Sequence, residues 1–451
     1  MPTTVHVVGI GGAGMSAIAT VLAAMGHTVT GSDLKASTVT ERLQGAGIEV
    51  TIGHDAASVG RADMVTISTA VGDENVEVVE AGRRGIPVLR RSETLTAIAA
   101  QRRCIAVAGT HGKTTTASML ALVLIEAGVR PSFIIGGDVN EIGTNAVWDD
   151  GEWLVVEADE SDGTFLALVP DIAIVTNVEA DHLDHYGTFD AVRAAFEEFV
   201  GSATLRRVVG GDDEVASAIG HRTGADTVGT GDGCSYRLAA ITPARSSIAF
   251  DLIDPGGTTL GRLAVPVPGV HNARNAAVAT VAALAAGAPF DAAVRALARF
   301  AGVARRFEFR GDANGVTFVD DYAHLPTEVR AALAAARDGA WRRVVAVFQP
   351  HRYSRTAALW SEFGSAFGDA DVVVVTDVYG SGEAPVPGVS GRLVADAVRR
   401  SDPGKQVIYV PGRVELRQVV QGVLRDGDLC CTLGAGDLTS LPDELLDDPR
   451  W

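Results

Sequence analysis

A glycine-rich loop that ends in a lysine lies at residues 109–116, where the sequence reads GTHGKTTT. An apolar, strand-like run precedes the loop and a helical pattern follows it. Backbone amides of such a loop can bind phosphate oxygens, the lysine can neutralise the β- and γ-phosphates, and a threonine hydroxyl can bind Mg²⁺. Because Lys35, Lys113 and Lys405 are the only lysines of the chain, this placement predicts a nucleotide-phosphate site. Strict Walker A spacing needs a glycine at Val107, so we interpret the loop as a shortened variant.

Acidic residues follow two strand-like runs downstream of this loop. Glu157 ends the run WLVVE, and Asp181 and His182 come just after IAIVTN. Because the carboxyl ends of parallel strands meet at one edge of a sheet, we expect these residues near the phosphate loop. Glu157 is a natural magnesium ligand, whereas a histidine ligand is less usual and His182 by itself is better explained as a polar loop residue.

A second glycine-rich motif, GIGGAG at residues 9–14, follows the first strand-like run of the chain. Asp33 lies 19 residues after Gly14, at the end of the next such run. This spacing fits the fingerprint of a pyrophosphate-binding turn, in which glycines let the ligand approach a helix N-terminus. NAD, FAD and a UDP-sugar all carry a pyrophosphate, and glycines that only pack a helix on a strand are a further interpretation.

Polar clusters also occur in the second half of the chain. They read HNARN at 271–275, ARRFE at 304–308, DDYAH at 320–324 and QPHRYSRT at 349–356. Asparagine amides can bind an adenine edge, and arginines can bind phosphates or carboxylates. None of these clusters is specific alone, since a capped helix or a salt-bridged surface has the same composition.

Alternating strand-like and helical segments predict parallel α/β units that position these motifs. The 451 residues suit about three such units. We predict three domains, over 1–95, 96–308 and 309–451, of which the first carries the pyrophosphate-type motif and the second carries the phosphate loop. Residues 222–268 differ in composition and predict antiparallel strands attached to the middle unit.

The composition excludes several classes of function. With 38 basic and 56 acidic residues, the net charge of -18 argues against a role in coating nucleic acid or anionic membranes. The four cysteines, at 104, 234, 430 and 431, are irregularly spaced and predict buried thiols rather than disulfides or a zinc site. Neither a signal peptide nor a membrane span is recognisable, so we expect a soluble cytoplasmic protein, as a monomer or an oligomer.

Taken together, the motifs resemble those of the Mur ligase family. The matching segments run in order over nearly the whole chain and include GIGGAGM, AGTHGKTTT, EADES, TNVEADHLDHY, HNARNA, ARRFE, DDYAHLPTE and FQPHRYSRT. This resemblance implies three α/β domains: an N-terminal Rossmann-like UDP-binding domain, a central P-loop ATPase-like parallel sheet and a C-terminal Rossmann-like domain.

The resemblance also implies an activity, closest to the branch of the family that adds L-alanine. In that reaction the carboxylate of UDP-N-acetylmuramate attacks the γ-phosphate of ATP, and L-alanine then attacks the acyl phosphate to form an amide. The implied cofactors are ATP, as a substrate, and Mg²⁺. The implied process is peptidoglycan precursor synthesis, and with it cell-wall biogenesis, cell shape and cell division.

Site residues are carried over position by position from the family motifs. The implied catalytic residues are Lys113, Glu157, His182 and His324. The implied metal ligands are Thr114, Glu157 and His182. The implied ATP-binding residues are Gly109, Thr110, His111, Gly112, Lys113, Thr114, Thr115, Asn275 and Arg306 on the phosphate and adenine side, and Asp321 at the ribose. Gly11, Gly14, Asp33 and Ser68 are implied at the UDP moiety, and Tyr322, His324, Arg352 and Arg355 at the amino acid.

Two departures and three alternatives accompany this interpretation. Leu325 stands where most relatives of this branch have a second histidine, which puts the hydrogen bonding around the amine in doubt. No lysine lies between Lys113 and Lys405, so the carbamoylated lysine of other branches is absent and Phe196 stands at the approximately matching place. The alternatives are a murein peptide ligase of cell-wall recycling, an NAD-dependent oxidoreductase and a non-catalytic nucleotide sensor.

Overall fold

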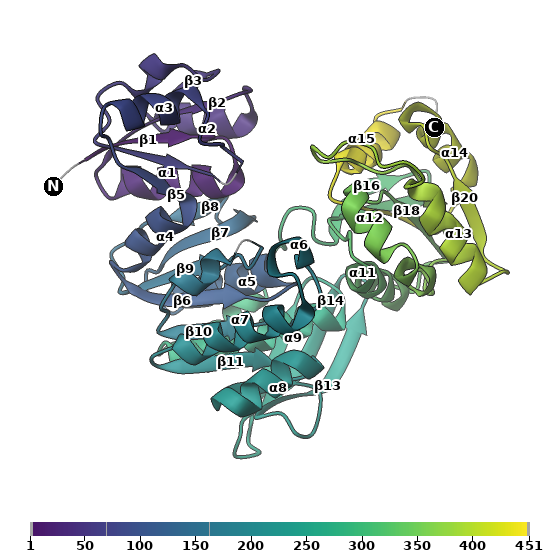
Figure 1. The fold of residues 1–451 in the computed structure, drawn as a ribbon. Coiled ribbons are helices and arrows are strands. Elements are labelled where there is room, and N and C mark those ends of the chain that lie inside the picture. Colours follow the sequence, from purple (N-terminus) through teal and green to yellow (C-terminus); the bar gives the residue numbers. More distant parts are fainter. Residues whose placement is uncertain (1–2, 69, 162, 449–451) are drawn as a thin grey trace. The chain divides into compact units, whose positions relative to one another are not determined.

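The computed structural model describes residues 3–68, 70–161 and 163–448 and contains three β-sheets with helices packed on them (Figure 1). The predicted α/β class with largely parallel sheets is confirmed. By its internal contacts the chain divides into two units. The first comprises Met1–Ala239, Asp251–Leu263 and Arg274–Phe300, and the second Ala240–Phe250, Ala264–Ala273 and Ala301–Trp451.

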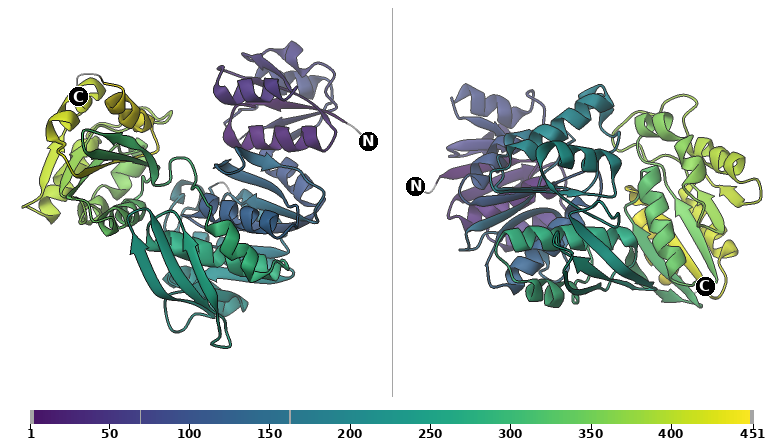
Figure 2. Two further views of the ribbon diagram at one scale, coloured as in Figure 1. Left: turned by 180° about the vertical axis from the view of Figure 1, so that it is seen from behind. Right: turned by 90° about the horizontal axis from the view of Figure 1, so that it is seen from below.

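The N-terminal sheet has five parallel strands in the order β3-β2-β1-β4-β5. Its strands are β1 (Thr4–Val8), β2 (Thr28–Asp33), β3 (Glu49–Ile52), β4 (Met64–Ile67) and β5 (Val88–Arg90), and its helices are α1 (Ala13–Ala24), α2 (Thr38–Gly45), α3 (Val76–Arg83) and α4 (Arg91–Ala99). Val7 and Val8 of β1 belong to two different apolar clusters, because successive side chains of a strand point to opposite faces. Both faces of this sheet therefore carry packed helices, as Figures 1 and 2 show.

The central sheet has ten strands in the order β15-β14-β13-β12-β11-β10-β6-β9-β7-β8. The strands are β6 (Arg103–Ala108), β7 (Ser132–Val139), β8 (Thr144–Val147), β9 (Trp153–Glu157), β10 (Ile172–Val175), β11 (Arg206–Gly210), β12 (Asp226–Gly229), β13 (Tyr236–Ala244), β14 (Ser247–Ile253) and β15 (Thr259–Val265). The helices are α5 (Lys113–Glu126), α6 (Leu183–Tyr186), α7 (Phe189–Ser202), α8 (Glu214–Thr223), α9 (Val270–Ala285) and α10 (Phe290–Leu297). Strand β6 lies between β10 and β9 and is parallel to both, so the three strand ends that carry candidate site residues are neighbours.

The antiparallel prediction for residues 222–268 is only partly correct. Strand β12 pairs with β11 in parallel, and β13 pairs with β12 in parallel as well. Helix α8 crosses over between β11 and β12, which is the connection that parallel neighbours require. Strands β13 and β14 are hydrogen-bonded neighbours separated by residues 245–246 alone, a length that only an antiparallel turn allows. The alternating composition identified strands here, but it carries no information about the direction of their partners.

The third sheet has six strands in the order β16-β17-β21-β18-β19-β20. Only the edge pair β16–β17 is antiparallel among its described pairings. The strands are β16 (Glu308–Ala313), β17 (Val316–Asp321), β18 (Arg343–Phe348), β19 (Val372–Val375), β20 (Gln406–Tyr409) and β21 (Asp428–Leu433), and the helices are α11 (Pro326–Asp338), α12 (Tyr353–Leu359), α13 (Gly391–Ser401), α14 (Arg413–Val423) and α15 (Leu441–Leu446).

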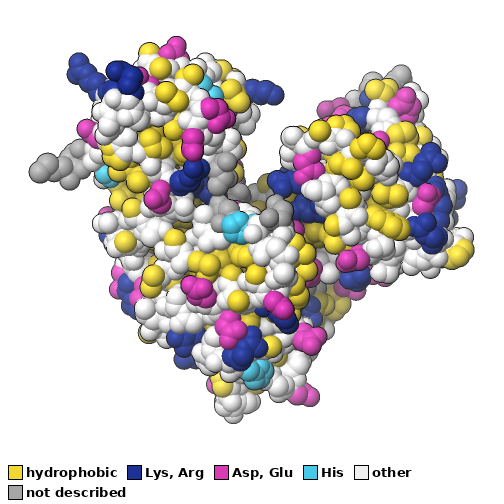
Figure 3. Space-filling model, in the orientation of Figure 1, with side chains coloured by type: hydrophobic (Ala, Val, Ile, Leu, Met, Phe, Trp, Pro, Cys, Tyr) yellow, Lys and Arg dark blue, Asp and Glu magenta, His cyan; other side chains and the backbone are white. Residues whose placement is uncertain are grey.

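Charged side chains of both signs lie on the surface, and most of the cysteine thiols lie in the interior. Basic and acidic side chains are mixed on the face drawn in Figure 3, which gives no continuous basic surface there. None of the helices in the described part of the chain has both the length and the apolar character needed to span a membrane. The four thiols are free, and Cys104, Cys430 and Cys431 are buried, whereas Cys234 is only partly so.

Candidate active site

The phosphate loop connects β6 to α5 and depends on two glycines with left-handed backbone. Gly109 has φ 129°, and a Cβ there would lie 2.1 Å from Thr176 Oγ1. Gly112 is the N-cap of α5 with φ 79°, and its Cβ would lie 2.7 Å from Asn275 Oδ1. A larger residue at either position would therefore clash and strain the backbone. The glycines keep the loop closely packed on its neighbours while the first amides of α5 face outward from the helix end.

Two polar residues that follow β10 hold the loop in place. The amide of Thr110 donates to the carbonyl of Asn177 (3.0 Å), and the amide of His111 donates to Asn177 Oδ1 (2.9 Å). Thr176 Oγ1 and Asn177 Nδ2 both donate to the carbonyl of His111, at 2.5 and 3.0 Å. Neither Thr176 nor Asn177 is among the residues predicted for the site. They stand inside the quoted segment TNVEADHLDHY, but only the pairing of β10 with β6 shows that they contact the loop.

Lys113 is held by a buried carboxylate that was also not assigned. Its Nζ donates to Glu160 Oε1 (2.8 Å) and to the carbonyl of Gly109 (2.7 Å). Burial alone would lower the pKa of Lys113, but the nearby charge of Glu160, with Asp159 and Glu157, raises it above the ordinary value. The lysine is therefore a fixed cation at the loop, where a nucleotide's phosphates would need it.

The remaining acidic residues gather beside the first turn of α5. Thr114 Oγ1 donates to Glu157 Oε1 (3.0 Å), and the amide of Gly136 donates to Glu157 Oε2 (2.7 Å). His182, with φ 55°, has Nε2 at 3.9 Å from Glu160 Oε1 and 3.5 Å from Asp181 Oδ2. Glu160 is 3% exposed, and its Oε2 accepts no hydrogen bond from the residues that the structure describes. Within that part of the chain, no three His, Cys, Asp or Glu side chains are arranged to hold a metal by themselves.

The other residues predicted for ATP divide between the two units. Thr115 and Asn275 are buried in the first unit, and Asn275 lies against the loop at Gly112. Arg306 and Asp321 belong to the second unit.

The four residues predicted for the UDP moiety lie at the carboxyl edge of the N-terminal sheet. The amide of Gly11 donates to Asp33 Oδ2 (2.8 Å), at the end of β2. Ser68 follows β4, and its Oγ lies 3.5 Å from the position of a Cβ on Gly9. Gly14 lies in the first turn of α1. The structure thus brings Gly11, Asp33 and Ser68 to the ends of strands β1, β2 and β4 respectively, and β1 lies between the other two. Ligands of such sheets bind at this edge.

In the second unit, Asp321 is a buried acceptor at the end of β17. It accepts hydrogen bonds from the amides of Phe307 and Ala323, both 2.8 Å long. Burial raises the pKa of Asp321 to about 6, although Arg306 and the two amides act in the opposite direction. The guanidinium of Arg306 lies over the ring of Tyr322, at 5.1 Å from its centroid.

The hydrogen-bond partners of His351 and His324 indicate which ring nitrogen of each carries the proton. Arg355 Nη1 lies 3.2 Å from His351 Nδ1, and because arginine only donates, this nitrogen must carry a lone pair. His324 Nδ1 lies 3.0 Å from the carbonyl of Tyr322, so that nitrogen must carry the proton and Nε2 the lone pair. Burial lowers the pKa of both histidines, that of His351 to about 4, so both are neutral near neutral pH. Arg352 is the N-cap of α12, with φ 67°.

Comparison with known proteins places the chain in a family of ligases. The Mur ligase catalytic-domain model matches residues 4–103, the Mur ligase middle-domain model residues 107–283 and the Mur ligase glutamate ligase-domain model residues 305–436. The chain belongs to the Mur ligase family. It is 44% identical to the UDP-N-acetylmuramate–L-alanine ligase of Geobacter sp. (strain M21), over 98% of this chain and 96% of that protein. Identity to the protein of the same name from Rubrobacter xylanophilus is 46%, covering 98% and 99% of the two chains.

Solved structures give the same result for the fold. The crystal structure of UDP-N-acetylmuramate–alanine ligase from Thermotoga maritima matches with a TM-score of 0.83 and 30% identity, over 99% of this chain and 98% of that one. A murein peptide ligase from Psychrobacter arcticus matches with a TM-score of 0.70 and 25% identity, over 98% of each chain. The predicted family and its three-domain α/β fold are therefore confirmed.

Proposed function

We propose that this chain joins L-alanine to the carboxylate of UDP-N-acetylmuramate, with ATP converted to ADP and phosphate, in peptidoglycan precursor synthesis. The observation that carries the proposal is the full-length likeness, at 44% identity or more, to proteins of that name. Because ATP drives the reaction, we place it in the cytoplasm.

The three parts of the chain have different proposed tasks. Residues 1–95 bind the UDP-sugar at Gly11, Gly14, Asp33 and Ser68. Residues 96–308 bind ATP at the loop that ends in Lys113. Residues 309–451 contribute Tyr322, His324, Arg352 and Arg355 at the amino acid, and Asp321 at the ribose. Arg306, near the end of the central part, lies on the adenine side.

In the first step, an oxygen of the sugar carboxylate attacks the γ-phosphorus, the bond to ADP breaks and an acyl phosphate forms. Charge grows on the transferred phosphoryl group, and Lys113 with the loop amides stabilises it because they are already oriented. In the second step, the amine of L-alanine attacks the acyl carbon and phosphate leaves. The amine must first lose a proton from its ammonium form, and His324 Nε2 carries the lone pair that can accept it.

The donor set beside α5 fits a magnesium ion. Mg²⁺ usually takes one or two carboxylates from the protein, together with phosphate oxygens and water. The hydroxyl of Thr114 and the carboxylate of Glu157, which are in contact, can supply the protein's share of such a site. A cluster of three ligands, which the described residues do not form, is not needed for this ion. Glu160 fits the same role, since its Oε2 is buried without a hydrogen bond and His182 lies beside it. When bound, the ion would neutralise phosphate charge.

The experiment that tests the function is phosphate release from ATP and Mg²⁺ with UDP-N-acetylmuramate. Three reactions are compared: one with L-alanine, one with an L-alanyl peptide and one without amine. We expect release that depends on L-alanine. Dependence on the peptide alone would instead identify a murein peptide ligase, and release without any response to amine would contradict a ligase.

A further inference from the structure

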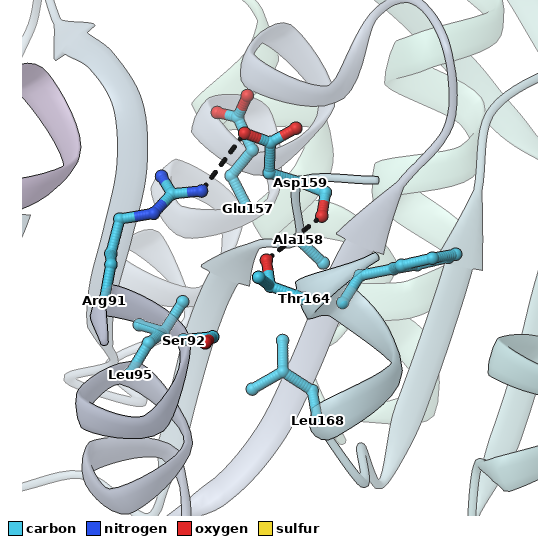
Figure 4. A pocket seen from close by; sticks show the side chains of 9 residues that line it. Arg91, Ser92, Leu95, Glu157, Ala158, Asp159, Thr164 and Leu168 are labelled. Atoms are coloured by element: carbon cyan, nitrogen blue, oxygen red, sulfur yellow. Dashed lines mark hydrogen bonds and ion pairs between the residues drawn. The ribbon is translucent and has the colours of Figure 1, made fainter. Parts of the chain in front are cut away.

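Arg91 lies beside Gly14 of the first glycine-rich motif and pairs with Asp159 of the acidic turn that follows β9. It begins α4 directly after β5, and its side chain is 24% exposed. Its Nη2 lies 3.2 Å from Asp159 Oδ2, in the turn that follows β9 (Figure 4). On its other side, a Cβ placed on Gly14 would lie 2.8 Å from Nη1. One guanidinium therefore lies between the turn that the UDP-sugar is proposed to bind and the acidic turn of the ATP site.

Asp159 lies within the electrostatic influence of two cations. An aspartate carboxyl is ionised at neutral pH, and Arg91 Nη2 lies 3.2 Å from Asp159 Oδ2. Lys113 is also the residue that must neutralise the phosphates of ATP. An aspartate not paired with Arg91 would be free to compete with those phosphates for the lysine.

A small cavity lies beside Arg91 and Asp159. The cavity there measures ≈20 Å³, which is space for about one water molecule. Leu95 and Leu168 line the cavity on its apolar side (Figure 4), and Phe165 lines it as well. We therefore place the substrate anion on the side of Gly14, close to Nη1.

Resting on the proposed function, we propose that Arg91 is a bridging residue of the ligase. One edge of its guanidinium contacts the anionic part of the UDP-sugar at Gly14, while Nη2 keeps Asp159 away from Lys113 and so preserves the affinity for ATP. The planar fork of arginine makes two directed contacts at once, which the single ammonium of a lysine cannot reproduce.

The test measures dissociation constants by calorimetry for UDP-N-acetylmuramate and for a non-hydrolysable ATP analogue with Mg²⁺. The variants are Arg91→Lys, Asp159→Asn and the double variant. Arg91→Lys should weaken UDP-sugar binding about tenfold, the cost of one charged hydrogen bond, and ATP-analogue binding several-fold. In the Asp159→Asn background, the same substitution should still weaken UDP-sugar binding but leave ATP-analogue binding unchanged, because no carboxylate remains to be released.

Arg90→Lys is the matched control. Arg90 precedes Arg91 and pairs with the exposed Asp73 (3.2 Å), so this change should alter neither constant. The inference is overturned if Arg91→Lys leaves UDP-sugar binding intact, or if its effect on the ATP analogue persists beside Asp159→Asn. A wild-type protein that binds the ATP analogue but not UDP-N-acetylmuramate would instead overturn the proposed function, and the inference with it.

Discussion

Single side chains decide whether the phosphate loop can act on ATP. Lys113 is the cation of the loop and is 16% exposed, whereas its partner Glu160 is 3% exposed. Removing the lysine alone would leave that carboxylate without its partner, and breaking a buried pair costs roughly 3–5 kcal/mol. A loss of activity could then reflect misfolding, so the residue must be tested in two backgrounds.

We expect Lys113→Ala to lower kcat by at least about a hundredfold, because one stabilising contact to the transferred phosphoryl group is lost. UDP-N-acetylmuramate binding should stay largely intact. The double variant Lys113→Ala/Glu160→Gln removes the unpaired charge and should recover thermal stability without recovering activity. Phosphate release and melting temperature are the measurements. Full release by a stable single variant, in a preparation free of contaminating ATPase, would refute the role of the lysine.

Asp321 and His351 should give opposite pH dependences of stability. The pKa of Asp321 is raised to about 6. Its contribution to the free energy of unfolding is therefore fully present below roughly pH 4 and is lost as the pH rises through 6. The pKa of His351 is lowered to about 4. Its contribution to the free energy of unfolding is therefore present above roughly pH 6.5 and is lost as the pH falls through 4.

Asp321→Asn should remove the first dependence and leave the second. The free energy of unfolding of the variant, relative to the wild type, should therefore increase from pH 4 to pH 6, by roughly 2–3 kcal/mol in total. Urea denaturation at pH 4, 5, 6 and 7 measures this difference. A difference that is constant over the range would disprove the raised pKa. His351→Gln serves as the control, since it should change the slope in the opposite direction.

At the scale of elements, α5 is bounded by two glycines with left-handed backbone. Gly112 at its start has φ 79° and packs against Asn275, whereas Gly128 just beyond its end has φ 75° and open space around its Cα. A non-glycine residue in this conformation costs roughly 1–2 kcal/mol. A substitution by alanine would therefore strain the backbone at both positions, but only at Gly112 would the new side chain also clash with a neighbour.

Gly112→Ala should weaken binding of an ATP analogue by at least about tenfold, because the loop must move to relieve the clash with Asn275. Gly128→Ala should lower the melting temperature slightly and leave nucleotide binding unchanged. Calorimetric titration and thermal unfolding of both variants test this. Equal losses of affinity in the two variants would mean that backbone strain, and not the contact at the loop, is responsible.

The sequence predicted most elements because short β-branched runs and amphipathic segments indicate parallel α/β units directly. It placed Glu157 at a strand end and Lys113 at a helix start, where the structure has them. It missed Glu160 and Arg91 as site residues, since neither ends a strand. Glu160 lies in a turn whose path is set by tertiary contacts, and Arg91 meets Asp159 across 68 residues of chain. Composition and spacing contain no information about such contacts.

At the scale of the whole molecule, the proposed tasks fall on separate parts of the chain. The phosphate loop belongs to the first unit, and Arg352 and Arg355 belong to the second. Changes in the amino-acid residues should therefore alter the use of L-alanine without altering nucleotide binding by the loop.

Arg352→Ala should raise KM for L-alanine about tenfold to a hundredfold, the effect of losing a charge-assisted hydrogen bond to its carboxylate. Affinities for UDP-N-acetylmuramate and for an ATP analogue should not change. Steady-state kinetics with L-alanine varied, together with binding titrations, separate the two effects. A parallel loss of nucleotide affinity would contradict the assignment of this arginine to the amino acid.

The central claim, that a sugar carboxylate is activated by phosphorylation and then captured by alanine, is tested most directly with UDP-N-acetylmuramate labelled with ¹⁸O in that carboxylate. Mass spectrometry follows both products after reaction with ATP and L-alanine. We predict a UDP-sugar extended by one alanyl residue and one ¹⁸O atom in each phosphate released. Unlabelled phosphate, or a UDP-sugar that gains no alanine while ATP is consumed, would contradict the account.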